Sequence, residues 1–385
     1  MAGMELVCGV PGQLAVRCVD VSADLATWIR TELDAVSPVD DVRGRVTIRA
    51  APAGSRLERP RREQINGDAG DGVVVGQADG ELVIDDAGGW TSIAGPPEDV
   101  QITMGPTTDR WRVMRDLLRP ALQIAGIEHG TSVAHAAGVR IADRGVLLTG
   151  WSESGKTEIA LALVERGAEF LGDKWMVWWT PQPAAATDGG ALIAPFPNRV
   201  GVRGWVVPYL PTIEARLRRG QRLRLRFGGL AAASARGLGR AGRRNRLTDA
   251  VLGPIGAAGS LADTIRLTRH DIGQDGPGAL PPQAKLGAVI LLETIEQGEA
   301  ASLDVVEPAP VAAAMARSAA FERRRYHLLG ERTAGFRPHP IPGFEIVARE
   351  AAAYERLIAR TPVYRVRAPF PGDPRIAADL ILRAL

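Results

Sequence analysis

The segment with the clearest potential for chemistry runs from Gly150 to Thr157 and reads Gly-Trp-Ser-Glu-Ser-Gly-Lys-Thr. It fits the phosphate-loop (Walker A) pattern of a glycine, four residues and then Gly-Lys-Ser/Thr. Gly150 and Gly155 permit sharp turns, so several backbone N–H groups can point into one concavity. We expect Lys156 to reach the β- and γ-phosphates of a nucleotide and Thr157 to place its hydroxyl on Mg²⁺.

The flanking residues decide whether this pattern has a structural context. A short apolar run at 146–149 predicts a buried strand, and apolar residues at helical spacing over 158–166 predict a helix that ends at Gly167. Strand, glycine loop and helix is the arrangement that the motif needs. Glu153 is unusual, because its carboxylate stands inside an anion-binding loop and either points outward or weakens binding. The residues expected to bind the nucleotide are Gly150, Ser152, Ser154, Gly155, Lys156, Thr157 and Glu158.

Two carboxylates follow predicted strands farther along the chain. Asp173 comes just after Phe170-Leu171, at the carboxyl edge where open α/β sheets bind ligands. A carboxylate there orients or deprotonates an attacking hydroxyl, or holds Mg²⁺, whereas the structural alternative is an aspartate that caps a helix or a turn. Glu293 ends the apolar run 286–292 and is a second candidate for Mg²⁺, through water.

His135 lies on the first strand of a predicted hairpin that spans 133–148 and delivers the chain into the glycine loop. From its position alone, His135 is better explained as a histidine with a structural role in the sheet.

The remaining pattern predicts an α/β fold with two parts. Residues 1–105 carry short strand candidates separated by turn residues and are expected to form a β-rich accessory domain. Residues 106–385 are expected to form the domain that contains the phosphate loop. Pro120 must kink or split the first helix of this domain. The main helices are expected at 109–127, 310–329, 344–359 and 373–385.

Composition sets limits on the function. The 385 residues carry a net charge of +3, so bulk charge indicates neither nucleic acid nor membrane as a partner. Cys8 and Cys18 are too few for a disulfide framework, and the first ten residues do not read as a signal peptide, so a cytoplasmic setting is expected. An arginine-rich insertion spans 211–246. It has few aromatic residues, which favours a solvated basic face or a docking segment for an acidic partner over a nucleic-acid platform.

From His135 to Asp173 the chain resembles HPr kinase/phosphorylase and the wider group of HPr-kinase-like proteins. The shared features are a strand with a histidine, the glycine loop, Glu158 directly after the Gly-Lys-Thr, an Arg-Gly at 166–167 and an aspartate at the next strand end. The resemblance covers about forty residues strictly and the range 130–370 loosely. It implies a kinase in which Lys156 and Thr157 bind phosphates and Mg²⁺.

The resemblance further implies that Asp173 is the catalytic base and that His135 lies beside the phosphates. The chain departs from the family at three points. Lys174 replaces a second aspartate, Glu153 replaces a glycine, and Arg203-Gly204 is only a fragment of the Glu-x-Arg-Gly stretch associated with phosphorolysis. Phosphorylase activity is therefore not expected, and HPr is not the expected substrate.

The sequence thus predicts an ATP-dependent, Mg²⁺-using kinase that transfers the γ-phosphoryl group to a hydroxyl of a peptide or protein serine, or of a small molecule. The alternative is a non-catalytic nucleotide-binding regulatory or scaffold protein. A nucleic-acid-binding ATPase ranks last. The identity of the acceptor, the choice of ATP over GTP and the formation of a homo-oligomer are left open.

Overall fold

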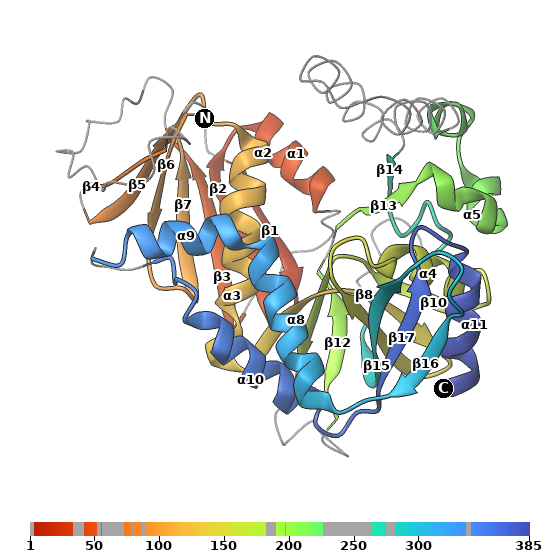
Figure 1. Cartoon of the computed structure of the whole chain (residues 1–385). Helices are drawn as coiled ribbons and strands as arrows, with labels where there is room; N and C mark the ends of the chain where they lie inside the picture. Colours follow the sequence, from red (N-terminus) through yellow and green to blue (C-terminus); the bar gives the residue numbers. More distant parts are fainter. Residues whose placement is uncertain are drawn as a thin grey trace, which may run out of the picture.

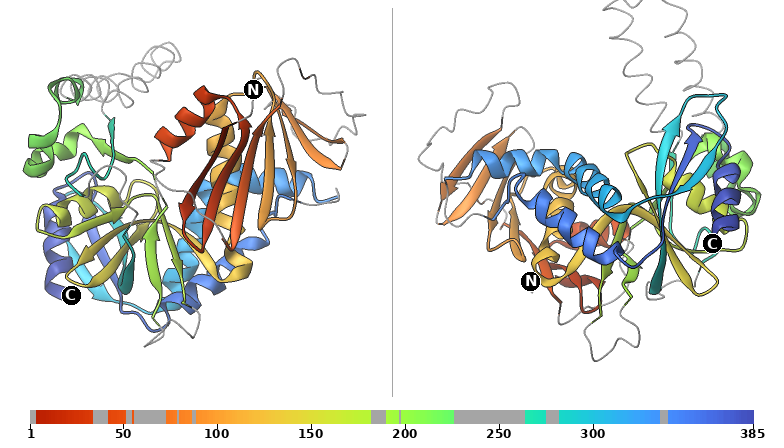
Figure 2. Two further views of the ribbon diagram at one scale, coloured as in Figure 1. Left: turned by 180° about the vertical axis from the view of Figure 1, so that it is seen from behind. Right: turned by 60° about the horizontal axis from the view of Figure 1, so that its bottom comes forward.

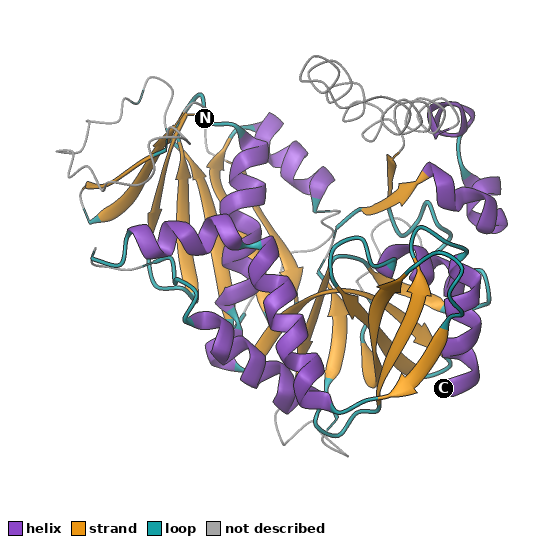
Figure 3. Ribbon diagram, in the orientation of Figure 1, coloured by secondary structure: helices purple, strands orange, loops and turns teal. Residues whose placement is uncertain are grey.

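The computed structural model describes residues 4–33, 42–51, 55, 73–78, 80–86, 89–181, 190–196, 198–225, 264–274, 282–335 and 340–385. These residues form two large β-sheets with helices packed on their faces, so the predicted α/β class is confirmed (Figures 1 and 3). None of the described helices is both long enough and apolar enough to cross a membrane.

The first sheet is built entirely from the N-terminal part of the chain and has the order β1-β2-β3-β7-β6-β5-β4. Its strands are β1 (Met4–Val10), β2 (Leu14–Val21), β3 (Gly44–Ala50), β4 (Val74–Ala78), β5 (Glu81–Asp86), β6 (Gly89–Ala94) and β7 (Asp99–Met104). β3 runs parallel to β2 and to β7, and the other neighbours are antiparallel. In β7 every second residue is buried, which is the pattern of a strand with one face on a core. A ten-residue helix, α1 (Ala23–Glu32), follows β2.

The predicted helix at 109–127 is divided into three pieces that lie against this sheet. They are α2 (Arg110–Val113), the π-helical turn η1 (Met114–Leu118) and α3 (Arg119–Ala125). Pro120 is the second residue of α3 and directly follows the π-helical turn, where the hydrogen-bond spacing of the helix changes. The core of the sheet also takes buried residues from beyond 105, among them Leu118, Tyr326 and Ile346. The domain division at 105 and 106 stays a prediction.

The second sheet has eight strands, in the order β10-β8-β11-β12-β15-β17-β16, with β9 paired to both β8 and β15. Its strands are β8 (Thr131–Ile141), β9 (Arg144–Gly150), β10 (Glu169–Gly172), β11 (Trp175–Trp179), β12 (Leu192–Pro195), β15 (Ala284–Ile295), β16 (Ser302–Val305) and β17 (Val363–Pro369). β8 and β9 form the expected antiparallel hairpin. β9 and β17 both run parallel to β15, and β10 runs in the direction of β9 because both are antiparallel to β8.

Two pairs of helices cover the two faces of this sheet. α4 (Lys156–Val164) and α11 (Pro374–Ala384) share one core with strand residues such as Leu148 and Ile290. α8 (Pro308–Glu322) and α10 (Ile346–Ile358) share another core with strand residues such as Leu147 and Val289. In Figures 1 and 2, α8 and α10 lie between the two sheets.

The expected helix at 310–329 breaks at Arg323, and its second half becomes α9 (Arg324–Arg332) against the first sheet. Between β12 and β15 the chain forms β13 (Val200–Arg203), η4 (Gly204–Tyr209), α5 (Pro211–Arg216) and β14 (Thr264–Leu267). Of the predicted arginine-rich insertion, residues 226–246 lie outside the described part of the chain.

Candidate active site

The segment Gly150–Thr157, called the glycine loop here, joins β9 to α4 and therefore has the strand–loop–helix context that its sequence requires. Gly150 has φ +150° and Gly155 has φ +87°, conformations that other residues rarely adopt. A Cβ atom at Gly150 would stand 2.6 Å from both the carbonyl oxygen of Leu292 and the hydroxyl of Ser154. Glycine is therefore required at this turn by backbone conformation and by space.

Lys156 is the first residue of α4, and its side chain folds back over the loop. Its ammonium donates hydrogen bonds to the carbonyl oxygens of Gly150, at 2.9 Å, and Trp151, at 2.6 Å. The side chain is buried. Burial lowers the pKa of Lys156 to about 8, although the negative charge of Asp173 opposes the shift. The Lys156 ammonium is thus held inside the loop by two carbonyl oxygens, and the oxygens of an incoming anion can replace them.

Asp173 and Thr157 are brought together from two segments. The Thr157 hydroxyl donates to Oδ1 of Asp173 at 2.9 Å. Asp173 is 1% exposed, and its Oδ2 is buried with no hydrogen-bond partner. Burial raises the pKa of Asp173, against the opposing charge of Lys174 and the bond from Thr157. A buried carboxylate oxygen without a partner is costly, so this atom is poised for a proton, a cation or a ligand hydroxyl.

His135 and Glu158 are two further polar side chains that line the site of this pair. His135 lies opposite Trp175 in the β8–β11 ladder, and its Nδ1 is buried without a partner. Burial and the charges of Lys156 and Lys174 hold the pKa of His135 well below its ordinary value, so the ring is neutral at neutral pH. Burial raises the pKa of the Glu158 carboxyl.

These side chains surround one cavity of about 250 Å³. Its lining includes His135, Ser154, Lys156, Thr157, Glu158, Asp173, Lys174, Arg203 and Phe370. The predicted residues Ser152 and Gly155 also line it, so the structure gathers eight predicted positions around a single hollow. Gly150 does not line the hollow but shapes it, since its carbonyl anchors Lys156.

Glu293 does not join this group. It lies on β15 with an exposed side chain and faces Arg365 and Arg367, at 3.9 Å and 3.4 Å. It does not line the cavity. The sheet explains the difference: β15 is in register with β9 at Leu292 and Gly150, and its next residue points away from the loop.

The mouth of the cavity is occupied by an ion pair that the sequence did not predict. Glu153, at φ +65°, points outward and accepts a hydrogen bond from Arg203 of β13 at 2.9 Å. The Arg203 guanidinium also lies 6.0 Å from the ring of Phe370, which in turn packs edge-on against Trp205. Phe370 follows β17 and lies beside Gly155 of the glycine loop. The sequence did not predict this contact, because the two residues are far apart in the chain.

α8 supports the loop from the other side. The Ser318 hydroxyl donates to the Gly150 carbonyl at 3.2 Å, and Phe321 packs edge-on against Trp151 at 5.8 Å. Neither contact has a sequence signal, because both depend on how α8 crosses the sheet.

Among the described residues, no group of three or more His, Cys, Asp or Glu side chains is arranged to hold a metal ion by itself. The Thr157 hydroxyl and the partnerless Asp173 Oδ2 are nevertheless hard oxygen donors of the kind that Mg²⁺ takes when phosphate oxygens and water supply the rest of its shell. The donor set therefore fits Mg²⁺ bound together with a nucleotide.

Comparison with known proteins adds little to this geometry. No protein family model matches the chain, and no curated protein matches it. Among solved structures, the HPr(Ser) kinase/phosphatase from Coxiella burnetii is similar at 11% sequence identity, over 66% of this chain and 95% of that chain, with a TM-score of 0.21. The similarity is distant, and a TM-score of 0.21 does not establish a shared fold.

Proposed function

We propose that the chain is an ATP-dependent kinase that transfers the γ-phosphoryl group of Mg²⁺-ATP to a hydroxyl group. The observation that carries the proposal is the Thr157–Asp173 contact beside the buried Lys156. It places a cation, a hydroxyl and a partnerless carboxylate oxygen around one cavity at the start of a helix. The positive end of α4 adds to the attraction for phosphate.

In this proposal the loop amides and Lys156 hold the phosphates, and Lys156 exchanges its two carbonyl partners for phosphate oxygens. Thr157 is the residue that would hold Mg²⁺, with phosphate oxygens and water in the rest of its shell, and Mg²⁺ would neutralise charge on the phosphates. The glycine loop thus presents the Lys156 charge to the phosphates by a change of hydrogen-bond partners, and the strands of the sheet need not move.

Asp173 is placed to act on the acceptor. Its Oδ2 lacks a hydrogen-bond partner in the protein, so it can accept the proton of an acceptor hydroxyl as the oxygen attacks the γ-phosphorus. Its raised pKa suits a base, because a carboxylate of ordinary pKa holds a proton weakly at neutral pH. His135 is neutral and lies in the same cavity, where it can orient the acceptor through its partnerless Nδ1.

Two positive side chains, Lys174 and Arg119, lie near Asp173 in the fold. Lys174 lines the cavity next to Asp173, and the following residue, Trp175, stacks under the Arg119 guanidinium at 4.6 Å. The Nε of Arg119 is buried without a partner, and burial together with the charge of Arg266 lowers the pKa of Arg119 to about 10. We therefore propose an acceptor that bears negative charge near its hydroxyl, such as an acidic peptide.

A non-catalytic nucleotide sensor is the second candidate, and the Glu153–Arg203 ion pair favours it. The pair keeps a carboxylate at the mouth of the cavity and engages an arginine that a γ-phosphate would otherwise meet. This alternative predicts nucleotide binding without phosphoryl transfer to any acceptor.

Incubation with γ-labelled ATP and arrays of serine peptides and small alcohols distinguishes the two candidates. The release of labelled phosphate to water serves as a readout that needs no acceptor. For the kinase we expect labelled acceptor with wild type and with Asp143→Asn, an exposed aspartate in the β8–β9 turn. We expect a loss of at least about 100-fold with Asp173→Asn. Binding of ATP without any transfer would instead establish the sensor.

A further inference from the structure

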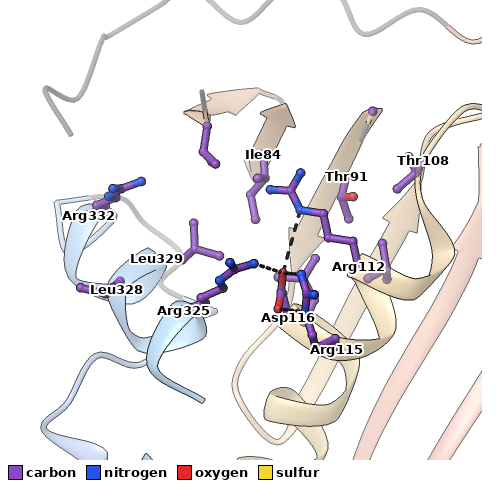
Figure 4. Close-up of a pocket in the computed structure, with 14 residues that line it drawn as sticks. Ile84, Thr91, Thr108, Arg112, Arg115, Asp116, Arg325, Leu328, Leu329 and Arg332 are labelled. Atoms are coloured by element: carbon purple, nitrogen blue, oxygen red, sulfur yellow. Dashed lines mark hydrogen bonds and ion pairs between the residues drawn. The ribbon is translucent and has the colours of Figure 1, made fainter. Parts of the chain in front are cut away.

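A second cavity, of about 360 Å³, lies away from the glycine loop, between the first sheet and α9 (Figure 4). Helical residues of α2 and η1 form one wall, α9 forms the opposite wall, and β5 and β6 contribute Ile84 and Thr91. We call it the arginine pocket because Arg112, Arg115, Arg325 and Arg332 all line it.

The charge of the arginine pocket is strongly unbalanced among its described lining residues, which include one carboxylate, Asp116. Arg115 donates to both oxygens of Asp116, at 2.7 and 2.8 Å, and Arg325 donates to Oδ2 at 3.2 Å. Arg112 approaches the same oxygen at 4.0 Å from the other side (Figure 4). One carboxylate therefore orients three guanidinium groups toward a single point.

The two outer arginines keep donors available beyond Asp116. The side chains of Arg115 and Arg325 are 60% and 63% exposed, and Arg325 uses one of its five N–H groups on Asp116. Asp116 itself is 12% exposed. Burial works against its charge, yet the hydrogen bonds and charge of Arg115 and the charge of Arg325 keep the pKa of this carboxyl below its ordinary value. It therefore stays ionised and holds the guanidinium groups in place.

Apart from Thr91 and Thr108, the rest of the lining is apolar. Ile84 and Leu117 are buried at the floor, and Leu328 and Leu329 of α9 stand at the rim, where Leu328 is 48% exposed. Pockets of this size with an apolar wall and a few converging polar groups are typical of small-molecule sites. An apolar floor below a row of guanidinium donors matches a molecule with an apolar body and an anionic head.

We propose that the arginine pocket binds a small amphipathic anion, whose carboxylate or phosphate head is held by Arg115 and Arg325 and whose apolar body lies against Leu117 and Leu329. Arginine is suited to this role because its planar fork binds both head groups in a bidentate manner. The proposal is independent of the chemistry at the glycine loop.

Isothermal titration calorimetry of the full chain tests the proposal with five probes. Octanoate and octyl phosphate carry both head and body, acetate and inorganic phosphate carry the head alone, and 1-octanol carries the body alone. We expect saturable binding of octanoate, octyl phosphate or both, at least tenfold tighter than any of the other three. Binding must persist in Lys156→Ala, which shows that the glycine loop is not the site.

Variants locate the bound head group. Arg325→Gln is expected to weaken binding tenfold or more, and Arg325→Lys is expected to weaken it less, since it keeps the charge but loses the fork. Arg349→Gln is the matched control: Arg349 is also 63% exposed and donates to Glu128 at 2.9 Å, but it does not line the pocket. An unchanged affinity in Arg325→Gln, an equal loss in the control, equally tight 1-octanol, or no saturable binding of either amphiphile would overturn the proposal.

Discussion

Replacing Glu350 by glutamine tests the ion pair that is most deeply buried among the described residues. Arg323 and Glu350 are 1% and 0% exposed, and their side chains form two hydrogen bonds where α8 gives way to α9. The Tyr354 hydroxyl lies 2.8 Å from Glu350 Oε1 and also 2.8 Å from the carbonyl oxygen of Val133. Gln123 of α3 lies 3.4 Å from Arg323. The Arg323–Glu350 pair therefore connects α10 with Gln123 of α3 and, through Tyr354, with Val133 of β8.

The expected loss follows from burial. Glu350→Gln keeps the shape but leaves the Arg323 charge without a counter-ion in a site closed to water, which costs about 3–5 kcal/mol of the free energy of unfolding. For a cooperative unit of about 150–250 residues, each kcal/mol lowers the midpoint by about 2–4 °C, so a drop of about 6–20 °C is expected. Thermal unfolding followed by circular dichroism measures it.

Two further variants make this test specific. Glu355→Gln removes an exposed carboxylate from the same helix and should change the unfolding free energy by no more than about 0.5 kcal/mol. The double variant Arg323→Met/Glu350→Leu removes both charges and should recover most of the loss. If Glu350→Gln unfolds at the same midpoint as the exposed control, the Arg323–Glu350 pair does not stabilise the fold, which contradicts the loss expected from its burial.

Three shorter predictions concern the glycine loop. Asp173→Asn should leave the Kd for Mg²⁺-ATP within about tenfold while phosphoryl transfer falls at least about 100-fold; equal losses in binding and transfer would argue against a base. Because burial lowers the pKa of Lys156 to about 8, its proton is lost as pH rises through 8, so the Kd should be flat from about pH 6.5 to 7.5 and then rise by up to tenfold per pH unit. Lys156→Arg should remove this rise, which calorimetry at several pH values would reveal, and a rise that persisted would assign it to another group. Glu153→Gln should tighten ATP binding severalfold at low salt and less at 0.5 M salt, because an exposed carboxylate is screened; weaker binding would mean that the Arg203 contact organises the site.

Local patterns predicted the loop and its flanks correctly, because the strand, the two glycines and the helix lie within about twenty residues of each other. The hairpin that carries His135 was also predicted correctly. The partnership of Thr157 with Asp173 was not predicted as a contact, since it depends on β10 lying next to β8. Glu293 shows the limit of such reasoning: the apolar run ends before it, but β15 continues through Ile295, and the Glu293 side chain pairs with Arg367 of β17.

The parts that sequence reasoning missed are long-range. Phe370 and Ser318 come from the end of β17 and from α8, and they meet the loop only because the sheet and helices fold around it. The predicted helix at 310–329 continues in helical spacing through Arg323, yet α8 ends at Glu322 and α9 begins at Arg324, and Arg323 between them bonds with Glu350 of α10. Helical periodicity contains no information about such a partner.

Calorimetric titration of Mg²⁺-ATP into wild type, Lys156→Ala and Lys285→Ala tests whether the glycine loop binds nucleotide. Lys285 is an exposed lysine of β15 outside the cavity and serves as the matched control. We expect one nucleotide bound per chain in wild type and in Lys285→Ala, and binding at least tenfold weaker in Lys156→Ala. No binding to wild type, or equal binding to Lys156→Ala, would contradict the claim that the glycine loop is a nucleotide site.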